Sequence, residues 1–540
     1  MSVAADHGQV SLQPAIEERL ARLAPDQRAA ATAPPGPVLC VAPAGSGKTT
    51  TLVARICWLV ASGASPARIT AVTFNKRAAD ELGERLATAL APLEVPETLA
   101  PRVRTFHALG REILVDARVS VANLVDRADV LRALNGGRRV SPANLRRFDD
   151  GFSRLKLDQG LSADAAAQQL RTPDLPEADL LRAFVAYERW LAEHGALDFD
   201  DLVRRALDAL RGDDRLLDRW RRNCSTLLVD EVQDVDRSQL DLAVLLAGER
   251  RDVFLVGDDD QTIYAWRLAD VRRVLDLAAS LPGLRRVDLV TNYRCPQPVV
   301  SRAVRLIGTN MERFAKTIVA RPAAPGRLLL CPDPGDELAR ARRLLEEWLA
   351  AEEGVHAVLA RTNAELAPYA AVALERGIAY RAAEDGLLLD DPAIDSLMGE
   401  LDEWRSPQAS LAHQAGPVAA TLLAWSLPYR TVHDLREAVG RARAKRTELR
   451  RDDASLVLAT AHGTKGLEFD HVAVIGMDEN VFPSRRTIED ADDPSRAVEE
   501  ERRLAYVAWT RAKKSLTLVY DPVAPSIFMR DAFSAAELAA

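Results

Sequence analysis

The chain has 540 residues, which is too long for a single hydrophobic core, so we expect several domains. Hydrophobic residues make up 48% and charged residues 28%, as in ordinary globular enzymes, and the net charge of -8 gives no compositional sign of nucleic-acid binding. A local nucleic-acid groove remains compatible with this total, because salt confines the field of each charge to about 10 Å.

The sequence carries no signal for targeting or for metal binding by cysteine. The N-terminal residues lack the basic and apolar regions of a signal peptide, and no apolar run approaches the roughly 18 residues of a membrane span. The five cysteines are scattered without a CxxC pair, which fits a reducing compartment. We therefore expect a soluble cytoplasmic protein that makes no membrane contact.

In chain order, the first residues alternate between strand and helix patterns. Residues 1–15 indicate an N-terminal tail, Val38–Ala42 a short buried strand, and the apolar spacing from Thr49 a helix that ends near Gly63. Ile69–Phe74 is the next predicted strand, and strand, loop, helix and strand form the unit of a parallel sheet. Residues 91–200 lack strand patterns and indicate a helical insertion.

Strand patterns return further along the chain, and helix-rich residues 395–450 interrupt them. The predicted strands are Thr226–Val229, Val253–Val256, Leu328–Leu330, Ala357–Leu359, Leu456–Thr460, Val472–Ile475 and Leu516–Tyr520. We therefore predict two α/β domains, each with a helical insertion. The first comprises residues 16–90 and 201–285 with the insertion 91–200. The second comprises 286–394 and 451–525 with the shorter insertion 395–450, and residues 526–540 form a C-terminal tail.

A glycine-rich loop follows the first predicted strand. Residues 42–49 (APAGSGKT) match the phosphate-binding pattern GxxxxGK[ST], except that Ala42 replaces the first glycine. In such a loop backbone N–H groups cradle phosphates, the Lys48 amine neutralises the β- and γ-phosphates, and the Thr49 hydroxyl binds Mg²⁺. The alternative is a chance glycine-rich turn, but this loop follows a strand and opens a helix, as the pattern requires.

Two carboxylates end the strand Thr226–Val229. Asp230 can hold Mg²⁺ through water, and Glu231 can polarise the attacking water, although two acidic residues can also cap a helix. ATP hydrolysis also needs positive charge at the γ-phosphate, for which Arg294 and Arg511 are candidates. The ordinary alternative for each arginine is a surface ion pair.

Taken together, the motifs resemble those of the UvrD, PcrA and Rep helicases of superfamily 1A. Each motif alone is weak, but all of them occur in family order between about Leu23 and Tyr520. They are Gln27, Ala42–Thr49, Thr73–Lys76, Thr105–His107, Asp198–Leu202, Val229–Asp234, Gly257–Arg267, Asn292–Arg294, Lys465–Phe469, Glu500–Val507 and Thr510–Ala512.

The resemblance implies two RecA-like parallel-sheet domains of the P-loop NTPase class, with ATP and Mg²⁺ between them. Gln27 would read the edge of the adenine, Tyr293 would stack on its face, and Glu468 would touch the ribose. Gln261 would sense the γ-phosphate and couple it to the nucleic-acid site, while Arg294 and Arg511 would reach ATP from the second domain. The remaining nucleotide contacts implied are Ala44, Gly45, Ser46, Gly47, Lys48, Thr49, Thr50 and Asp230.

A motor on single-stranded DNA needs aromatic faces on which bases stack, each worth about 1–3 kcal/mol. Tyr264 and Trp266 follow Gln261 directly, so phosphate sensing and base stacking share one loop. Core packing is the alternative for an aromatic side chain, and a structural hydrogen bond is the alternative for a histidine. The further DNA contacts implied by the resemblance are Phe74, Asn75, Thr105, His107, Arg267 and His462.

The chain departs from the family at several points. Relatives have a much longer insertion in the second domain, called 2B, which contacts duplex DNA and regulates unwinding; here residues 395–450 replace it, with a basic segment at Gly440–Arg451. Thr50 stands where relatives often have an arginine beside the adenine. Leu268 stands where glycine is usual.

The motifs predict an ATP-dependent translocase and helicase of the UvrD type that acts on single-stranded DNA and its junctions with duplex, in repair, replication or recombination. A 3′-to-5′ polarity is implied by the resemblance. The alternative is an ATP-gated subunit that binds single-stranded DNA and needs a protein partner for loading or unwinding. A small-molecule kinase or GTPase conflicts with the Tyr264-Ala265-Trp266 loop and with both downstream arginines.

Overall fold

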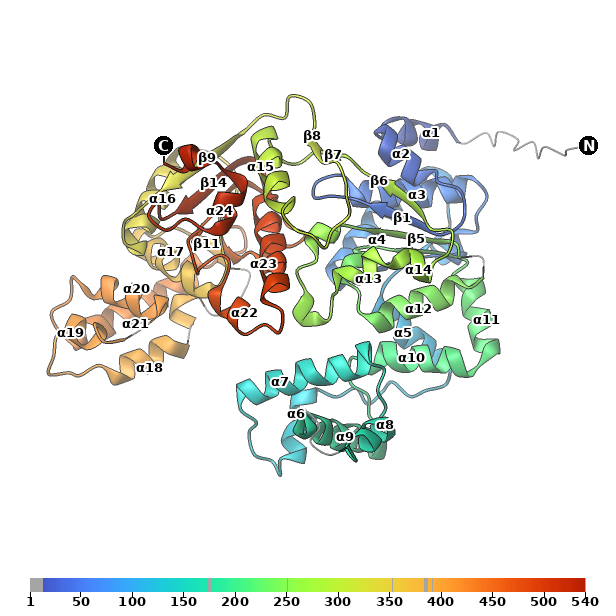
Figure 1. The fold of residues 1–540 in the computed structure, drawn as a ribbon, viewed down its shortest axis with the longest axis horizontal. Coiled ribbons are helices and arrows are strands. Elements are labelled where there is room, and N and C mark those ends of the chain that lie inside the picture. Colours follow the sequence, from blue (N-terminus) through green and yellow to red (C-terminus); the bar gives the residue numbers. More distant parts are fainter. Residues whose placement is uncertain are drawn as a thin grey trace, which may run out of the picture. The chain divides into compact units, whose positions relative to one another are not determined.

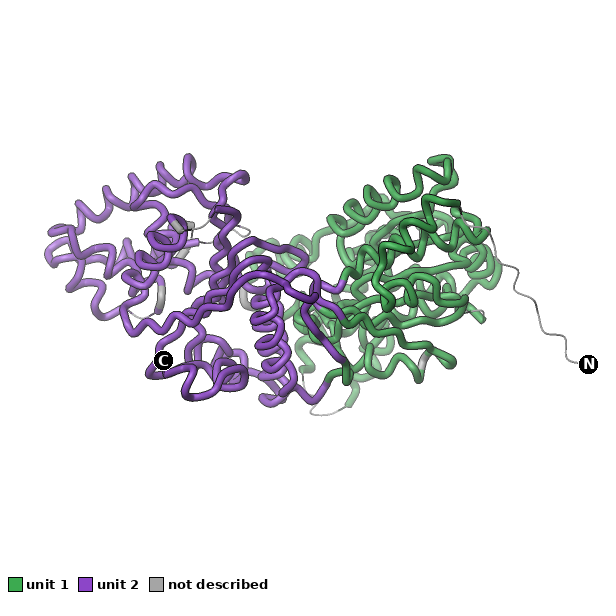
Figure 2. Tube along the Cα trace, turned by 90° about the horizontal axis from the view of Figure 1, so that it is seen from above, with its two compact units in different colours: residues 1–43, 47–290, 313–316 green, residues 44–46, 291–312, 317–540 purple. Residues whose placement is uncertain are grey.

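The computed structural model describes residues 13–172, 177–249, 251–351, 353–382, 387–390, 392–414 and 416–539. Two six-stranded parallel sheets organise this part of the chain, one in each of two compact units (Figure 1 and Figure 2). Unit 1 comprises residues 1–43, 47–290 and 313–316, and unit 2 comprises residues 44–46, 291–312 and 317–540. The predicted α/β class with two parallel-sheet domains is confirmed.

The sheet of unit 1 has the strand order β3-β2-β4-β5-β1-β6. Its four inner strands are buried throughout, as expected for apolar runs covered by helices on both faces. The strands are β1 (Val38–Val41), β2 (Ile69–Thr73), β3 (Arg102–Thr105), β4 (Thr226–Val229), β5 (Val253–Gly257) and β6 (Arg285–Asp288).

Helices cover the two faces of this sheet because successive strand side chains point in opposite directions. In β1, Val38 and Cys40 pack with α2, α3 and α4, whereas Leu39 and Val41 pack with α5, α10 and α12. The helices of this unit outside the insertion are α1 (Pro14–Ala21), α2 (Pro25–Ala31), α3 (Lys48–Ala61), α4 (Lys76–Leu90), α5 (Phe106–Asp116), α10 (Asp201–Gly212), α11 (Asp214–Asn223), α12 (Arg237–Ala247), α13 (Val271–Leu275) and α14 (Leu277–Ser280).

The insertion of unit 1 has a small core of its own, built on Phe152, Phe184 and Tyr187. Its helices are α6 (Arg127–Leu134), α7 (Pro142–Ser153), α8 (Ala163–Gln169) and α9 (Ala178–Glu193), with the short π-helical turn η4 (Arg154–Asp158). The expectation that residues 91–200 contain no strand is wrong at β3. That strand is a half-buried edge strand in which arginine alternates with other residues, so it lacks the apolar run that marks the inner strands.

The main sheet of unit 2 has the order β11-β12-β10-β13-β14-β9 and is also parallel throughout. The strands are β9 (Arg327–Pro332), β10 (His356–Ala360), β11 (Tyr380–Ala382), β12 (Leu456–Thr460), β13 (Phe469–Val474) and β14 (Ala512–Tyr520), with a separate pair β7 (Thr291–Asn292) and β8 (Val319–Ala320). The helices outside the insertion are α15 (Gln297–Ile307), α16 (Glu337–Ala351), α17 (Asn363–Arg376), α22 (Arg485–Glu489), α23 (Pro494–Trp509), α24 (Ile527–Ala532) and α25 (Ala535–Leu538).

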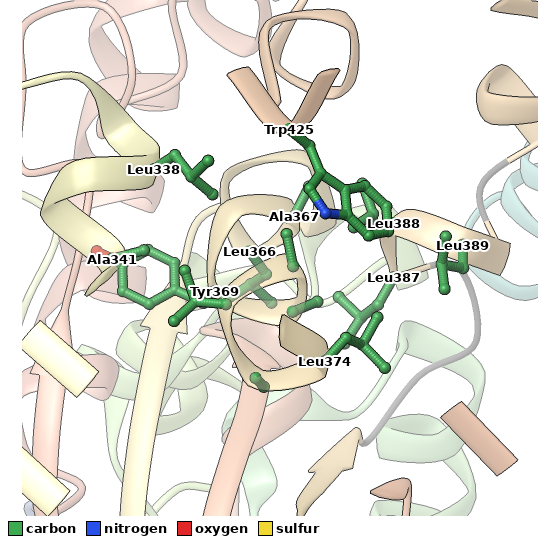
Figure 3. Close-up of a cluster of buried hydrophobic side chains, with 14 of the residues drawn as sticks. Leu338, Ala341, Leu366, Ala367, Tyr369, Leu374, Leu387, Leu388, Leu389 and Trp425 are labelled. Atoms are coloured by element: carbon green, nitrogen blue, oxygen red, sulfur yellow. The ribbon is translucent and has the colours of Figure 1, made fainter. Parts of the chain in front are cut away.

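The insertion of unit 2 is joined to its sheet domain by a shared hydrophobic core. Its helices are α18 (Pro392–Glu400), α19 (Pro407–Leu411), α20 (Pro417–Ser426) and α21 (Val432–Leu449). Trp425 of α20 and Leu435 of α21 belong to the same buried cluster as Leu366 and Leu374 of α17 (Figure 3). Because these side chains are buried together, the insertion is a fixed cap on α17.

The two predicted tails differ from expectation. Residues 1–12 of the N-terminal tail lie outside the described residues, and α1 already begins at Pro14. The described residues 526–539 contain two helices, and the first is packed, because Phe528, Met529 and Phe533 are buried and α24 packs on α15. Among the described helices, none combines the length and apolar character that a membrane span requires.

Candidate nucleotide site and nucleic-acid interface

The candidate residues of unit 1 lie along one edge of its sheet. Parallel strands all end on the same side, so the residues that follow them meet there. The phosphate loop follows β1, Asp230 follows β4, Asp258 follows β5, Phe74 follows β2 and Thr105 ends β3. The order β3-β2-β4-β5-β1 therefore places the nucleotide candidates directly beside the nucleic-acid candidates.

The phosphate loop needs glycine at two positions and tolerates alanine at a third. Gly45 and Gly47 have φ of 68° and 87°, in the left-handed region. A Cβ on Gly45 would lie 2.8 Å from Cβ of Arg294, and one on Gly47 would lie 2.6 Å from Nε2 of Gln27. Ala42 has no positive φ, and its N–H bonds to the carbonyl of Gly257 at 2.8 Å, so alanine there leaves the loop intact.

The amine of Lys48 lies 3.1 Å from Oε2 of Glu231. Burial lowers the pKa of Lys48, but Glu231, Asp258 and Asp230 together outweigh it and raise that pKa above its ordinary value. Burial and the charge of Glu231 raise the pKa of Asp230 to about 7. The cluster therefore holds excess negative charge, which suits it to a cation.

A hydroxyl and a carboxylate, those of Thr49 and Asp230, are available there as hard oxygen ligands, and these fit Mg²⁺ together with phosphate oxygens and water. In the described parts of the chain, no group of three or more His, Cys, Asp or Glu side chains is arranged to bind a metal. The metal would thus be held jointly by protein and nucleotide.

A chain of hydrogen bonds leads from Glu231 to Gln261. The buried Gln233, on the short helix η5 (Val232–Asp234), donates from Nε2 to Glu231 and accepts at Oε1 from the N–H of Asp258 at 3.0 Å. Gln261 closes η6 (Asp259–Gln261) and donates to Oδ2 of Asp258 at 2.7 Å. Glu231 itself has φ of 50°, a backbone conformation that is uncommon for non-glycine residues.

The candidates of unit 2 gather around Arg294. The tip of the phosphate loop, residues 44–46, groups with this unit: the N–H of Tyr293 donates to the carbonyl of Gly45 at 2.8 Å. Nε of Arg294 lies 2.8 Å from Glu468, and its Nη1 bonds to the carbonyl of Thr510 at 3.2 Å.

Arg511, next to Thr510, is buried, and its guanidinium donates to the backbone carbonyls of Val507 and Leu467. Arg294 and Glu468 thus meet beside the loop tip, while Arg511 is held close by with its donors already engaged.

A cavity of about 290 Å³ lies beside Gln27 and Thr50 in unit 1. Its wall also includes two arginines of the N-terminal segment, Arg19 and Arg22, together with Leu23. The position where relatives often have arginine is Thr50 in this chain, but the cavity it lines contains guanidinium groups from α1 and the turn after it. Sequence reasoning missed these two residues because no motif marks them.

A larger cavity of about 600 Å³ lies between the sheet edge and the insertion of unit 1. It is lined by six of the predicted nucleic-acid residues, namely Phe74, Asn75, Thr105, His107, Trp266 and Arg267. Tyr264 stacks on Phe74, with ring centroids 5.4 Å apart and planes 11° from parallel, and Trp266 stands edge-on to Tyr264. Trp266 is 56% exposed, and the guanidinium of Arg267 lies over its ring, 4.7 Å from the centroid.

Two of these residues also have structural roles. The side chain of Asn75 caps α4 by accepting from the N–H of Ala78, and that of Thr105 caps α5 by accepting from the N–H of Ala108. His462 belongs to unit 2, on the turn η9 (His462–Thr464), and does not line this cavity. Burial, together with Arg361 and Lys465, lowers the pKa of His462 to about 4.

Phe199 is a cavity residue that the site prediction missed. It lies between two acidic residues that turn inward, yet its own ring is 56% exposed and stacks on His107 at 3.9 Å. Burial lowers the pKa of His107 to about 4, so this imidazole is neutral near pH 7. In the sequence, Phe199 is the one aromatic residue in the acidic run Asp-Phe-Asp-Asp, and this pattern could have marked it as a site residue.

A buried ion network anchors the insertion below that ring. Arg127 contacts Asp198 and Asp200 at 2.9 and 2.8 Å, and Lys156 contacts Asp198 and Asp201 at 2.9 and 3.1 Å. These pairs join α6 and η4 to the loop before α10. The acidic residues of this motif are therefore structural, and they hold Phe199 outward.

Leu268, which replaces the usual glycine, has φ of 67° in the left-handed region. Glycine is favoured there because it lacks the steric conflict of a Cβ. Leucine nevertheless occupies the position and lines the larger cavity, and its carbonyl accepts from Arg273.

Comparisons with known proteins agree with this geometry. Residues 23–282 match the UvrD/REP helicase N-terminal domain, and residues 431–522 match the UvrD-like helicase C-terminal domain. The chain is 26% identical over 619 residues to ATP-dependent DNA helicase Rep of Salmonella typhimurium, covering 92% of this chain and 90% of that protein. It is 30% identical over 568 residues to ATP-dependent DNA helicase UvrD2 of Mycobacterium tuberculosis, covering 93% and 79%. It is 27% identical over 615 residues to DNA helicase II of Escherichia coli, covering 92% and 84%.

Proposed function

Because this chain belongs to the UvrD/Rep family of helicases, we propose that it is an ATP-driven motor that moves 3′-to-5′ along single-stranded DNA and separates duplex at its junctions. DNA repair, replication or recombination is the setting in which such a motor acts. The motor would hydrolyse ATP, with Mg²⁺ as the required metal ion.

The nucleotide roles follow from the sheet edge of unit 1. Lys48 neutralises the phosphates, Thr49 and Asp230 hold Mg²⁺, and Glu231 polarises the attacking water. Arg294 and Arg511 would supply positive charge that stabilises the γ-phosphate during transfer. Glu468 would orient Arg294 between turnovers. When bound by these residues, Mg²⁺ would offset the negative charge of the phosphates.

The nucleic-acid roles follow from the larger cavity. Its aromatic rings offer faces to unpaired bases, and stacking of this kind is tolerant of sequence. Trp266 and Phe199 are the most open of these rings. His107 remains uncharged near neutral pH and serves as a flat stacking partner, because burial keeps its pKa near 4.

One observation carries the proposal: the group that senses phosphate and the groups that stack bases stand on the same short segment. Gln261 is bonded through Asp258 and Gln233 to Glu231, and three residues later Tyr264 begins the stack with Phe74. A change of charge at the γ-phosphate would thereby affect the position of the base-stacking rings through these few hydrogen bonds. Loss of the γ-phosphate would shift that segment between two states.

The test is ATP turnover with and without a single-stranded oligonucleotide, followed by strand displacement on duplexes with 3′ or 5′ tails at matched salt, because binding to DNA depends on salt. We expect turnover to rise with oligonucleotide and displacement to require the 3′ tail. Turnover that ignores saturating oligonucleotide would refute the motor. Displacement from the 5′ tail would refute the polarity.

A second candidate is favoured by the compact insertion that contains α18–α21, in which α20 and α21 pack on α17. In that case the chain is an ATP-gated subunit that binds single strands and relies on a protein partner to open duplex. It would show oligonucleotide-stimulated turnover but displace neither tailed duplex.

A further inference from the structure

We propose that the short segment Arg313–Lys316, here called the strap, is a positioning device that fixes the phosphate-sensing and base-stacking segment of residues 258–266. The inference rests on the proposed function of Gln261 and Trp266. Neither Arg313 nor Lys316 would touch nucleotide or DNA; both would act through the aspartates that precede Gln261.

Three consecutive aspartates share one buried ammonium. Nζ of Lys316 lies 2.7 Å from Asp258, 2.5 Å from Asp259 and 2.9 Å from Asp260, and the Lys316 side chain is 0% exposed. Burial lowers the pKa of Lys316, but the three carboxylates outweigh it and raise that pKa, so the amine is charged throughout the working range. A charge at this depth is retained only where its partners fully compensate it.

The rest of the strap adds further bonds to the same turn. The guanidinium of Arg313 binds both oxygens of Asp260, at 2.9 and 2.8 Å, in the two-pronged geometry that fixes orientation as well as distance. The N–H of Phe314 donates to Asp259 at 2.8 Å, and Arg286 of β6 donates to the carbonyl of Ala315 at 2.8 Å. Each of the three aspartates is thus tied to the strap.

The chain path also places the strap on unit 1. Residues 291–312 and the chain from Thr317 onward belong to unit 2, yet the four residues between them group with unit 1. The strap therefore packs against the turn after β5 in unit 1, whereas the chain on either side of it groups with unit 2.

The strap also determines where Gln261 points. Asp258 uses Oδ1 for Lys316 and Oδ2 for the side-chain amide of Gln261, so the ammonium fixes the carboxylate that holds the amide. Removing the ammonium would deprive Asp258 and Asp259 of the cation that they share, while Asp260 would keep its ion pair with Arg313. Asp258 would then shift its position, and Gln261 would lose its fixed direction.

The main test compares Lys316→Met with the native chain, because methionine keeps the length of the side chain and removes its charge. We expect the turnover stimulated by single-stranded DNA to fall about 10- to 100-fold, the range for small misplacements of a catalytic group, while the KM for ATP changes less than about threefold. Affinity for single-stranded DNA should also fall, because Trp266 follows on the same segment.

Arg313 supplies a milder pair of variants in case Lys316→Met fails to fold. Arg313→Ala should lower DNA-stimulated turnover, and Arg313→Lys should restore part of it, because lysine keeps the charge and loses the two-pronged bond. Leu86→Ala is the control for lost stability: Leu86 is buried in unit 1, on α4, in a hydrophobic cluster to which no residue of the strap belongs. It should lower the melting temperature and leave the ratio of stimulated to basal turnover unchanged.

The inference is overturned if the strap variants melt earlier, as we expect of Leu86→Ala, but keep the native stimulation ratio. That result would show a structural role only. If the native chain itself ignores DNA, the proposed function fails instead, and the two failures are therefore separable.

Discussion

The Nζ atom of Lys48 and the Oε2 atom of Glu231 lie 3.1 Å apart, so the residue that should bind phosphate is paired with the residue that should activate water. On the proposed function, we expect the arrival of ATP to break this pair, because Lys48 would then turn its charge to the phosphates. Glu231 is released at the same moment. The ion pair would thus compensate the charge of Lys48 between turnovers and couple nucleotide binding to the readiness of the base.

Glu231→Gln is expected to separate binding from chemistry. Glutamine keeps the shape and the contact with Gln233 but cannot accept a proton, so kcat should fall about 10²–10⁴-fold while ATP still binds. Lys48→Ala should instead remove both binding and turnover. Fluorescent-nucleotide titration and steady-state ATPase assays distinguish the two, and equal loss of binding in both variants would contradict the assignment of Glu231.

Trp266→Ala should weaken binding to single-stranded DNA by about 1–3 kcal/mol, because it removes one stacking face. Its ring is 56% exposed, so the melting temperature should change little. Trp404, 96% exposed on the chain between α18 and α19 of unit 2, provides a matched control, since Trp404→Ala removes an equally large ring outside the cavity. Fluorescence anisotropy with a labelled oligonucleotide measures the DNA affinity of both variants. Equal effects would show that Trp266 does not contact the DNA.

The sequence predicted the inner strands well and the edges poorly. β4 and β12 were predicted to the residue, because each is an apolar run bounded by polar turns. β3 was missed because an edge strand is half-buried and tolerates arginine at alternate positions. The C-terminal helix α24 was missed because its few apolar residues can be recognised as core residues only when the packing of α24 on α15 is known.

The candidate site likewise contains residues that a local motif marks and residues whose partners are distant in the sequence. Residues marked by motifs, such as Lys48 and Trp266, were found because their chemistry is tied to local spacing. Lys316 and Arg19 were not, since their partners are dozens of residues away or unmarked. Gln233 lies inside a recognised motif, but its bond to the N–H of Asp258 depends on β4 and β5 being neighbours.

Asp236 gives a prediction about pH. Burial is the main cause that raises its pKa to about 7, with Asp200 and Asp158 adding to the effect and Arg273 opposing it. A carboxyl whose folded pKa lies above its ordinary value binds its proton more tightly when folded, so stability falls as pH rises from about 3.8 to about 7. Asparagine keeps the cap on α12, where Asp236 accepts from the N–H of Gln239, and has no proton to lose.

Relative to Asp236→Asn, the native chain should therefore lose about 2 kcal/mol of stability between about pH 5.5 and about pH 8. Denaturant melts at the two pH values measure this difference. Asp213→Asn is the control, because Asp213 caps α11 in the same way but is exposed. If Asp213→Asn gives the same pH response, the effect does not come from burial.

Arg19 is expected to take over the role that Thr50 cannot perform in the smaller cavity. Arg19→Ala should raise the KM for ATP about 3- to 30-fold, the range for loss of a cation stacked on an aromatic ring, with little change in kcat. Arg28→Ala, on the exposed side of the neighbouring α2, should have no effect. Adding Thr50→Arg to Arg19→Ala should recover the affinity, and absence of recovery would show that the cavity does not bind the base.

Gly110 sets the distance between α5 and α10, and with it the stack of His107 on Phe199. A Cβ on Gly110 would lie 2.2 Å from the carbonyl oxygen of Leu202, so an alanine there must push the two helices apart. His107 lies on α5 and Phe199 directly precedes α10, so their 3.9 Å stack should open. Gly110→Ala should then weaken binding to single-stranded DNA by about 1–3 kcal/mol, as should Phe199→Ala, which removes the ring itself.

Gly83→Ala separates this effect from the general preference of helices for alanine. Gly83 lies in α4, and a Cβ there would meet nothing within 4 Å, so the substitution should stabilise the chain by roughly 0.5–1 kcal/mol and leave DNA binding unchanged. Because Phe199→Ala keeps the helix spacing and Gly110→Ala keeps the ring, similar losses in both would assign the binding to the stacked pair. Normal binding by Phe199→Ala would show that the ring is exposed without serving as a DNA contact.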